Sequence, residues 1–132
     1  RLDSFLSDGA ASYDAKVLTI EHVLPQTVLA GSEWEEHWPE ADVRQQWVHK
    51  IANLVPLTQQ RNSAASNFDF TKKKTAYFGG RKGVSSYVMT TQVLNTPEWT
   101  LDVVKKRQQN LLEVLEAGWQ LKPEPSACQS KV

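Results

Sequence analysis

Residues 18–26 read LTIEHVLPQ and residues 52–62 read ANLVPLTQQRN, and these two stretches decide the fold. The apolar, β-branched run at 17–20 predicts a buried strand of about five residues, which ends at the following proline. The run at 53–57 predicts a second short extended segment, after which the chain is expected to turn into a helix over 58–65. The sequence therefore predicts two short strands followed by a helix.

Helical patterns fill much of the remaining sequence. Ser32 begins the side-chain pattern of a capping box and is expected to open a helical region. That region is interrupted near Pro39 and resumes as far as Ile51. A further helix is expected over 69–78, with Gly79 at its end.

The last helix has the clearest pattern. Thr96 is expected to cap it, Pro97 to occupy its first position and Glu98 to complement the helix dipole. Apolar residues then recur at helical spacing as far as Trp119. The fold class expected from all these patterns is mostly helical with a small two-stranded element.

The composition limits the class of protein. The 132 residues fit one domain, expected at 17–120, with a polar lead-in at 1–16 and a disordered tail at 121–132. The single Cys128 can form neither an internal disulfide nor a multi-cysteine zinc site. No apolar run approaches the roughly 20 residues of a spanning helix, so we expect a cytoplasmic domain without a membrane partner. Because the sequence begins with Arg1, we expect a piece of a longer protein.

The net charge is zero, but the charges are unevenly distributed. Residues 1–60 carry nine acids and four bases, whereas residues 61–107 carry nine bases and three acids. A basic half is compatible with a phosphate-binding face, and a solvated lysine-rich surface is the alternative. Six basic residues are the candidates for contact with nucleic acid: Arg61, Lys72, Lys73, Lys74, Arg81 and Lys82. Three consecutive lysines span about 200° of a helix, so one or two are expected to contact phosphates and the rest to be solvated.

The Glu21-His22 pair lies where the first strand runs into its turn. Neighbouring residues on a strand point to opposite faces, but a bend at this point can bring both side chains to one pocket. A carboxylate is a hard ligand suited to Mg²⁺ or Mn²⁺, and a neutral imidazole can accept a proton from water near pH 7. An incidental pair is the alternative, because Glu-His pairs are common.

Two asparagines define the second stretch. Asn53 opens the extended segment, and Asn62 follows nine positions later on the expected helix. Asn is a poor helix former, so Asn62 is either a solvent-facing residue or a cation ligand through its amide oxygen. Asn67 either reaches the same site or caps the next helix. Arg107 on the last helix is expected to reach either a phosphate or a buried carboxylate.

The other histidines and the aromatic residues are expected to be structural. His37 and His49 have no acidic or cysteine partner at ligand spacing, so both are expected on the surface. Val23, Leu24 and Leu57 are expected to pack beneath the strands. The tryptophans mostly fall at helical spacings with other apolar residues and are expected in the core: Trp34, Trp38, Trp47, Trp99 and Trp119.

Together these motifs resemble a known family. A strand with Glu-His, then x-x-Pro-Gln, a strand opened by Asn and a helix carrying Asn resemble the ββα-metal fingers of HNH nucleases. IEHVLPQ with ANLVPLTQQRN is similar to the HNH domain of RNA-guided Cas nucleases, including the nine-residue step between the asparagines. The longer run NLVPLTQQRNSAASNFDFTKKKTAYF, with Trp99, Arg107 and Trp119 downstream, looks like the C-terminal nuclease domain of GmrSD-type restriction enzymes. The resemblance covers residues 18–119 and implies an α+β, mostly helical fold, in which helices surround a ββα-metal (His-Me finger) core with two short antiparallel strands.

The resemblance also implies a role for each site residue. His22 would deprotonate the attacking water, Glu21 and Asn62 would hold one divalent ion, and Asn53 would brace the loop or orient the imidazole. The implied catalytic residues are therefore His22, Asn53 and Asn62, and the implied cofactor is Mg²⁺ or Mn²⁺. Asn62 stands where HNH proteins often have a second histidine, and its amide oxygen favours these hard ions over Zn²⁺.

The implied function is a metal-dependent DNA endonuclease domain that nicks or cuts the phosphodiester backbone. By the same resemblance it would be the effector of a restriction or anti-phage defence protein, controlled by an N-terminal sensor domain that uses ATP or GTP. A homodimer would be the form that cuts both strands. Two alternatives stay open: a non-catalytic nucleic-acid-binding module of the same fold, and a helical protein-interaction domain with an incidental Glu-His pair.

Overall fold

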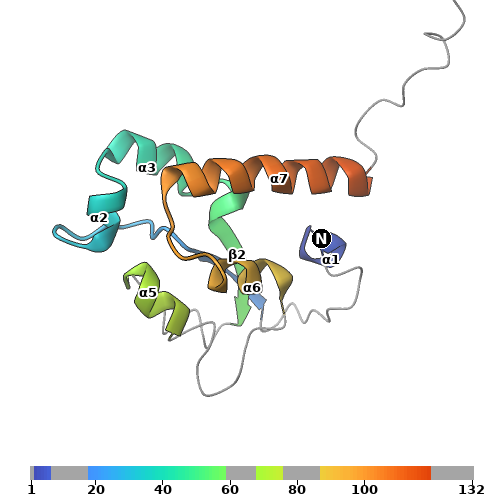
Figure 1. The fold of residues 1–132 in the computed structure, drawn as a ribbon, viewed down its shortest axis with the longest axis horizontal. Helices are drawn as coiled ribbons and strands as arrows, with labels where there is room; N and C mark the ends of the chain where they lie inside the picture. Colours follow the sequence, from blue (N-terminus) through green and yellow to red (C-terminus); the bar gives the residue numbers. More distant parts are fainter. Residues whose placement is uncertain (1, 7–17, 59–67, 76–86, 120–132) are drawn as a thin grey trace, which may run out of the picture.

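The structure is a computed structural model, and it describes residues 2–6, 18–58, 68–75 and 87–119. Helices surround one antiparallel sheet, in which β1 (Leu18–His22) pairs with β2 (Leu54–Thr58) (Figure 1). In the register of this sheet, Glu21 lies opposite Val55 and His22 lies opposite Leu54. The α+β, mostly helical fold with two short antiparallel strands is therefore confirmed.

Two short helices and a 3₁₀ turn connect the strands. α2 (Glu33–His37) begins after Ser32, whose side-chain oxygen accepts a hydrogen bond from the Glu35 N–H at 3.4 Å, as the capping pattern predicts. The expected interruption follows, and α3 (Ala41–Trp47) resumes the helical region. The turn η1 (Ile51–Asn53) then leads directly into β2, so residue 51 belongs to this turn and not to α3.

Helices from both ends of the sequence pack against one another. α7 (Leu101–Trp119) runs along one side of the molecule, with α1 (Leu2–Leu6) near its C-terminal end (Figure 1). α1 contacts both α7 and α6 (Val88–Leu94), and α6 contacts β2. A Cβ atom at Gly118 would come within 2.6 Å of the Phe5 ring, so glycine at this position allows α1 to approach α7 closely. Residues 2–6, expected in the polar lead-in, are thus a folded helix packed on the domain.

The start of α7 differs from the sequence prediction. The helix begins at Leu101, not at residue 97, and the Thr96 N–H donates instead to the Val93 carbonyl at the end of α6. The physical reason is the burial of Trp99, which is 2% exposed. The carbonyl of Trp99 accepts the indole N–H of Trp38 at 2.8 Å, which holds this segment in a non-helical conformation.

The core lies between the sheet and the helices. Val23, Leu24 and Leu57 are fully buried, as expected. Three tryptophans are buried in the same cluster: Trp34, Trp38 and Trp99. Trp119 is 49% exposed, so the prediction of a core position is wrong for this residue.

Some predicted elements lie outside the described residues. These are the helix expected over 58–65, beyond its first residue, and the tail expected from residue 121. Of the helix expected over 69–78, the structure describes the part that forms α5 (Phe70–Lys73) and the two residues after it. Among the helices that are described, none combines the length and the apolar character needed to cross a membrane.

Candidate functional site

The last two residues of β1 have different surroundings. Glu21 is 6% exposed, whereas the imidazole of His22 is partly exposed at the end of the strand. The alternation of side chains along a strand places them on opposite faces. One residue therefore faces the interior and its neighbour faces outward.

Glu21 forms a buried ion pair with Lys73 of α5. The Lys73 Nζ donates to Glu21 Oε1 at 2.7 Å, to the His22 carbonyl at 2.8 Å and to the Val23 carbonyl at 2.9 Å. These three acceptors match the three protons of an ammonium group. Burial raises the pKa of Glu21 and lowers the pKa of Lys73, and the attraction between the two charges opposes both shifts. α5 is thereby attached to the end of β1.

The structure separates the three consecutive lysines. The side chain of Lys73 is 0% exposed, so the expectation that it contacts DNA phosphates is wrong, and the alternative of a solvated side chain is wrong as well. Lys72 is exposed, with its ammonium 3.8 Å from the centre of the Phe68 ring. Lys74 is partly buried and donates to the Thr96 carbonyl at 3.1 Å. Lys72 is therefore the most accessible of the three.

Asn53 braces the loop that follows β1. Its side-chain Nδ2 donates to the carbonyls of Leu24 and Val48 at 3.0 and 2.9 Å. Its Oδ1 accepts the Leu24 N–H at 2.8 Å and the indole N–H of Trp99 at 3.0 Å. The residue is 1% exposed, and these four bonds use its amide fully. Two roles were considered for Asn53, bracing the loop and orienting the imidazole, and these contacts support the first.

His22 forms a pair with His49. The His22 Nε2 lies 3.0 Å from His49 Nδ1, and the two rings meet nearly at right angles, with centres 5.1 Å apart. The His22 Nδ1 lies 3.4 Å from the amide nitrogen of Gln26. Burial lowers the pKa of His22, and the charges of His49 and Lys73 lower it further. His49 is on the surface as expected, but it has a partner that the sequence did not indicate.

Three residues of the site have contacts that the sequence did not predict. Lys73 was expected to contact a phosphate or to be solvated, His49 was expected to be an unpartnered surface residue, and Gln26 was only part of a motif. Gln26 follows His22 by four positions, so their proximity has a local signal, whereas His49 lies 27 positions away and has none. The proposed ligand Asn62 and four further candidates lie outside the described residues: Arg61, Asn67, Arg81 and Lys82.

Of the two proposed metal ligands, Glu21 and Asn62, only Glu21 is among the residues that the structure describes. Its Oε1 is engaged by Lys73, and the carboxylate has a second oxygen that could serve a cation. No group of three or more His, Cys, Asp or Glu side chains within the described ranges could hold a metal ion. The carboxylate oxygen nevertheless has the donor chemistry that a hard divalent ion requires.

Comparison with known proteins identifies the family of the chain. No curated protein matches it. The family model described as GmrSD restriction endonucleases, C-terminal domain, matches residues 1–114. The match includes α1, both strands and every residue of the site described above. The chain therefore belongs to the family formed by the C-terminal domains of GmrSD restriction endonucleases.

Proposed function

We propose that this domain is a metal-dependent DNA endonuclease, with His22 as the general base that activates water for attack on the phosphodiester. The observation that carries the proposal is the partly exposed imidazole of His22, which lies between His49 and Gln26 at the end of β1. Membership of a restriction endonuclease family supports the reaction class.

The hydrogen bonds of His22 indicate which ring nitrogen accepts the proton. The amide nitrogen of Gln26 can only donate, so the His22 Nδ1 is the acceptor in their 3.4 Å contact. A neutral imidazole carries one ring proton, which then lies on Nε2 and is donated to His49 Nδ1. The lone pair on His22 Nδ1 can receive a proton from a water molecule that displaces Gln26.

The surroundings of His22 keep the imidazole neutral. Its pKa is lowered from the ordinary value of 6.5, first by burial and then by the charges of His49 and Lys73. A general base has to be unprotonated before it can take a proton from water. His22 is therefore in its reactive form near pH 7. In this scheme His49 is a positioning residue, because it accepts the Nε2 proton and holds the ring in one tautomer.

Glu21 and Asn62 are proposed to hold Mg²⁺ or Mn²⁺. Carboxylate and amide oxygens are hard donors that suit these ions. Lys73 engages one oxygen of Glu21, so the second oxygen is the candidate ligand. When bound, the ion would supply positive charge to the scissile phosphate and to the leaving oxygen. Asn53 would hold the loop after β1 in place while the backbone of the substrate is bound.

DNA is the proposed substrate, and its backbone is the proposed point of contact. Among the described candidates Lys72 is exposed and can reach a phosphate, and Arg61, Arg81 and Lys82 are proposed to add to this contact. We further propose that the domain is the effector of a restriction or anti-phage defence protein with an N-terminal sensor domain. A homodimer is proposed for cleavage of both strands.

The proposal can be tested by nicking of supercoiled plasmid DNA in Mg²⁺, Mn²⁺ or EDTA. His22→Ala should lower the cleavage rate by about 10²- to 10⁴-fold, the contribution typical of general base catalysis. His37→Ala is the matched control, because His37 is a partly exposed histidine paired with Glu33 on α2, away from β1. Its cleavage rate should equal that of the unmodified chain.

Each outcome separates the candidate functions. Metal-dependent nicking that disappears only in His22→Ala supports the nuclease. DNA binding without cleavage under any metal condition would favour the non-catalytic nucleic-acid-binding module. Equal activity in all three chains would exclude His22 as the base.

A further inference from the structure

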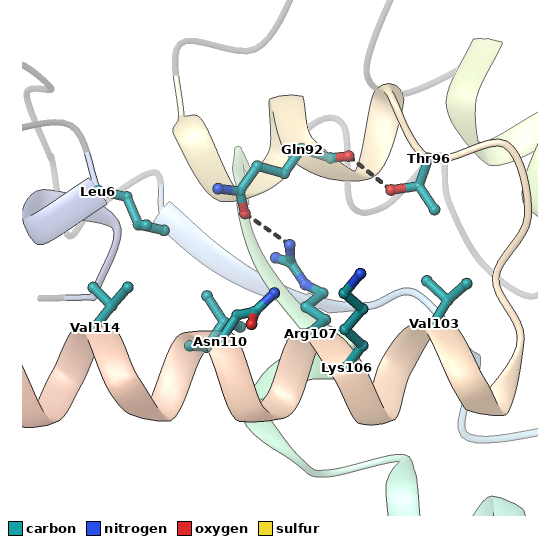
Figure 2. A pocket seen from close by; sticks show the side chains of 9 residues that line it. Leu6, Gln92, Thr96, Val103, Lys106, Arg107, Asn110 and Val114 are labelled. Carbon is teal, nitrogen blue, oxygen red and sulfur yellow. Dashed lines mark hydrogen bonds between the residues drawn. The ribbon is translucent and has the colours of Figure 1, made fainter.

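A cavity lies between α6 and α7, and none of its described lining residues belongs to the candidate site. Its volume is about 310 Å³, and side chains from both helices point into it (Figure 2). Leu6 of α1 and Val103 of α7 belong to its apolar wall. Its polar lining consists of five side chains: Gln92, Thr96, Lys106, Arg107 and Asn110.

Arg107 dominates the polar wall, and its hydrogen-bond partners among the described residues are neutral. Its Nε donates to the Ala52 carbonyl at 3.0 Å, and its Nη1 donates to the side-chain oxygen of Gln92 at 2.7 Å (Figure 2). Its Nη2 lies 3.4 Å from the Met89 carbonyl. The guanidinium carbon lies 5.8 Å from the centre of the Trp99 ring. These contacts hold the group in place but do not neutralise its charge.

The positive charge of Arg107 lacks a carboxylate partner in the described part of the chain. The ion pairs seen there, Glu33–His37 and Glu21–Lys73, do not include it. Burial lowers its pKa to about 10, and no acid within the described ranges opposes this shift. A partly buried charge without a counter-charge is unfavourable, and an anion that entered the cavity would relieve this cost.

The cavity also has hydrogen-bond donors to spare. A guanidinium has five N–H groups, of which Arg107 uses three in the bonds above, so two form no hydrogen bond with the residues that the structure describes. The ammonium of Lys106 and the side-chain amides of Gln92 and Asn110 line the same space. Among the described residues, no aspartate or glutamate lines the cavity, and the acids nearest in sequence on α7, Asp102 and Glu113, lie outside the lining. Donors and positive charge in one cavity match the chemistry of phosphate.

We propose that this cavity binds a phosphate group, held by the side chains of Arg107 and Lys106. The phosphate would belong to a free nucleotide or to DNA, and the apolar wall would contact the organic part next to it. The inference is independent of the proposed nuclease, because it involves neither His22 nor a metal ion.

The test is calorimetric titration of the full chain at low ionic strength with inorganic phosphate and, separately, with thymidine monophosphate. Lys106→Ala should weaken binding by about tenfold, the scale of one charge-assisted hydrogen bond. The matched control is Lys105→Ala, an exposed lysine next to it on the same helix that does not line the cavity. Arg107→Lys keeps the charge but loses the planar fork, and it should weaken binding as well. If Arg107→Lys does not fold because the hydrogen bonds of Arg107 are lost, Lys106→Ala still tests the proposed site.

A short DNA duplex titrated in EDTA distinguishes the two sources of the phosphate. Binding of thymidine monophosphate that depends on Lys106 and not on Lys105 supports a free nucleotide. The same dependence seen only with the duplex assigns the phosphate to DNA. Equal weakening of binding by both lysine variants would show that overall charge and not the cavity causes the effect, and it would overturn the proposed site. Absence of binding to all three probes would overturn it too.

Discussion

Two adjacent residues of β1 belong to regions with opposite properties. The inner network, formed by Glu21, Lys73 and Asn53, is 6%, 0% and 1% exposed, respectively, and its charges and amide groups are paired within the fold. The imidazole pair, formed by His22 and His49, lies at the surface. The strand places neighbouring side chains on opposite faces, so Glu21 on the inner face stabilises the segment that holds His22 on the outer face. Changes in the inner network should therefore reduce stability, whereas changes in the imidazole pair should reduce the rate of cleavage.

The largest effect is expected for Lys73→Ala. Its loss leaves the carboxylate of Glu21 buried without a counter-charge, which raises the pKa of Glu21 further and costs about 3–5 kcal/mol of unfolding free energy. Urea denaturation measures this change. Lys72→Ala is the control on the same helix and should cost no more than about 1 kcal/mol, the value of an exposed cation–π contact.

The double variant Glu21→Leu with Lys73→Met sharpens this prediction. It removes both charges and should be more stable than Lys73→Ala alone, because no unpaired charge remains. If Lys73→Ala instead unfolds at the same urea concentration as the unmodified chain, the ion pair does not stabilise the end of β1.

The next largest effect is expected for Asn53→Ala. This change leaves the N–H groups of Leu24 and Trp99 buried without acceptors, so the free energy of unfolding should fall by at least about 2 kcal/mol. Gln109→Ala provides an exposed amide control on α7 and should change stability by less than about 0.5 kcal/mol. Equal melting temperatures for the two variants would contradict the bracing role.

A smaller effect on rate is expected at His49. His49→Leu removes the acceptor for the His22 Nε2 proton and should lower kcat by about tenfold with little change in KM, as for other residues that orient a functional imidazole. His49→Asn has an oxygen that can occupy the place of Nδ1, so it should recover most of the activity. Failure of His49→Asn to rescue, or an equal change in KM, would indicate a structural role only.

The smallest effect concerns the pH dependence of cleavage. His22 acts as a base only when unprotonated, so its lowered pKa should place the acid limb of the rate profile below pH 6.5. His49→Asn removes one of the charges that lower this pKa, and the limb should move to higher pH by less than about one unit. Rates measured between about pH 5 and pH 8 test the direction, and a shift to lower pH would show that His49 does not act in this way.

Much of the fold was predictable because its signals are local. The β-branched run before Glu21 and the capping pattern at Ser32 act within a few residues, and both the strand and the helix cap were observed; the strand ends at His22, three residues before the proline. The burial of Val23 and Leu24 was predicted from the same local pattern and is confirmed. The candidate base and the bracing amide are also in short motifs, so His22 and Asn53 could be named from the sequence alone.

The orientation of helices relative to the sheet had no such local signal. Three consecutive lysines have the same side chain, and only the position of α5 against β1 decides that Lys73 faces inward. The start of α7 likewise depends on the buried Trp99, whose packing overrides the capping pattern at Thr96.

The amino-acid sequence by itself determined the strands, the position of the Glu-His pair and the family resemblance, because these depend on local patterns and on short motifs. The tertiary structure alone decided that His49 meets His22 across 27 positions. It also decided that the described partners of Arg107 are neutral oxygens and not the buried carboxylate that was one of its two expected partners. The physical reason is that a helical or extended pattern fixes the direction of a side chain within its own element, whereas its partner is chosen by the packing of distant elements.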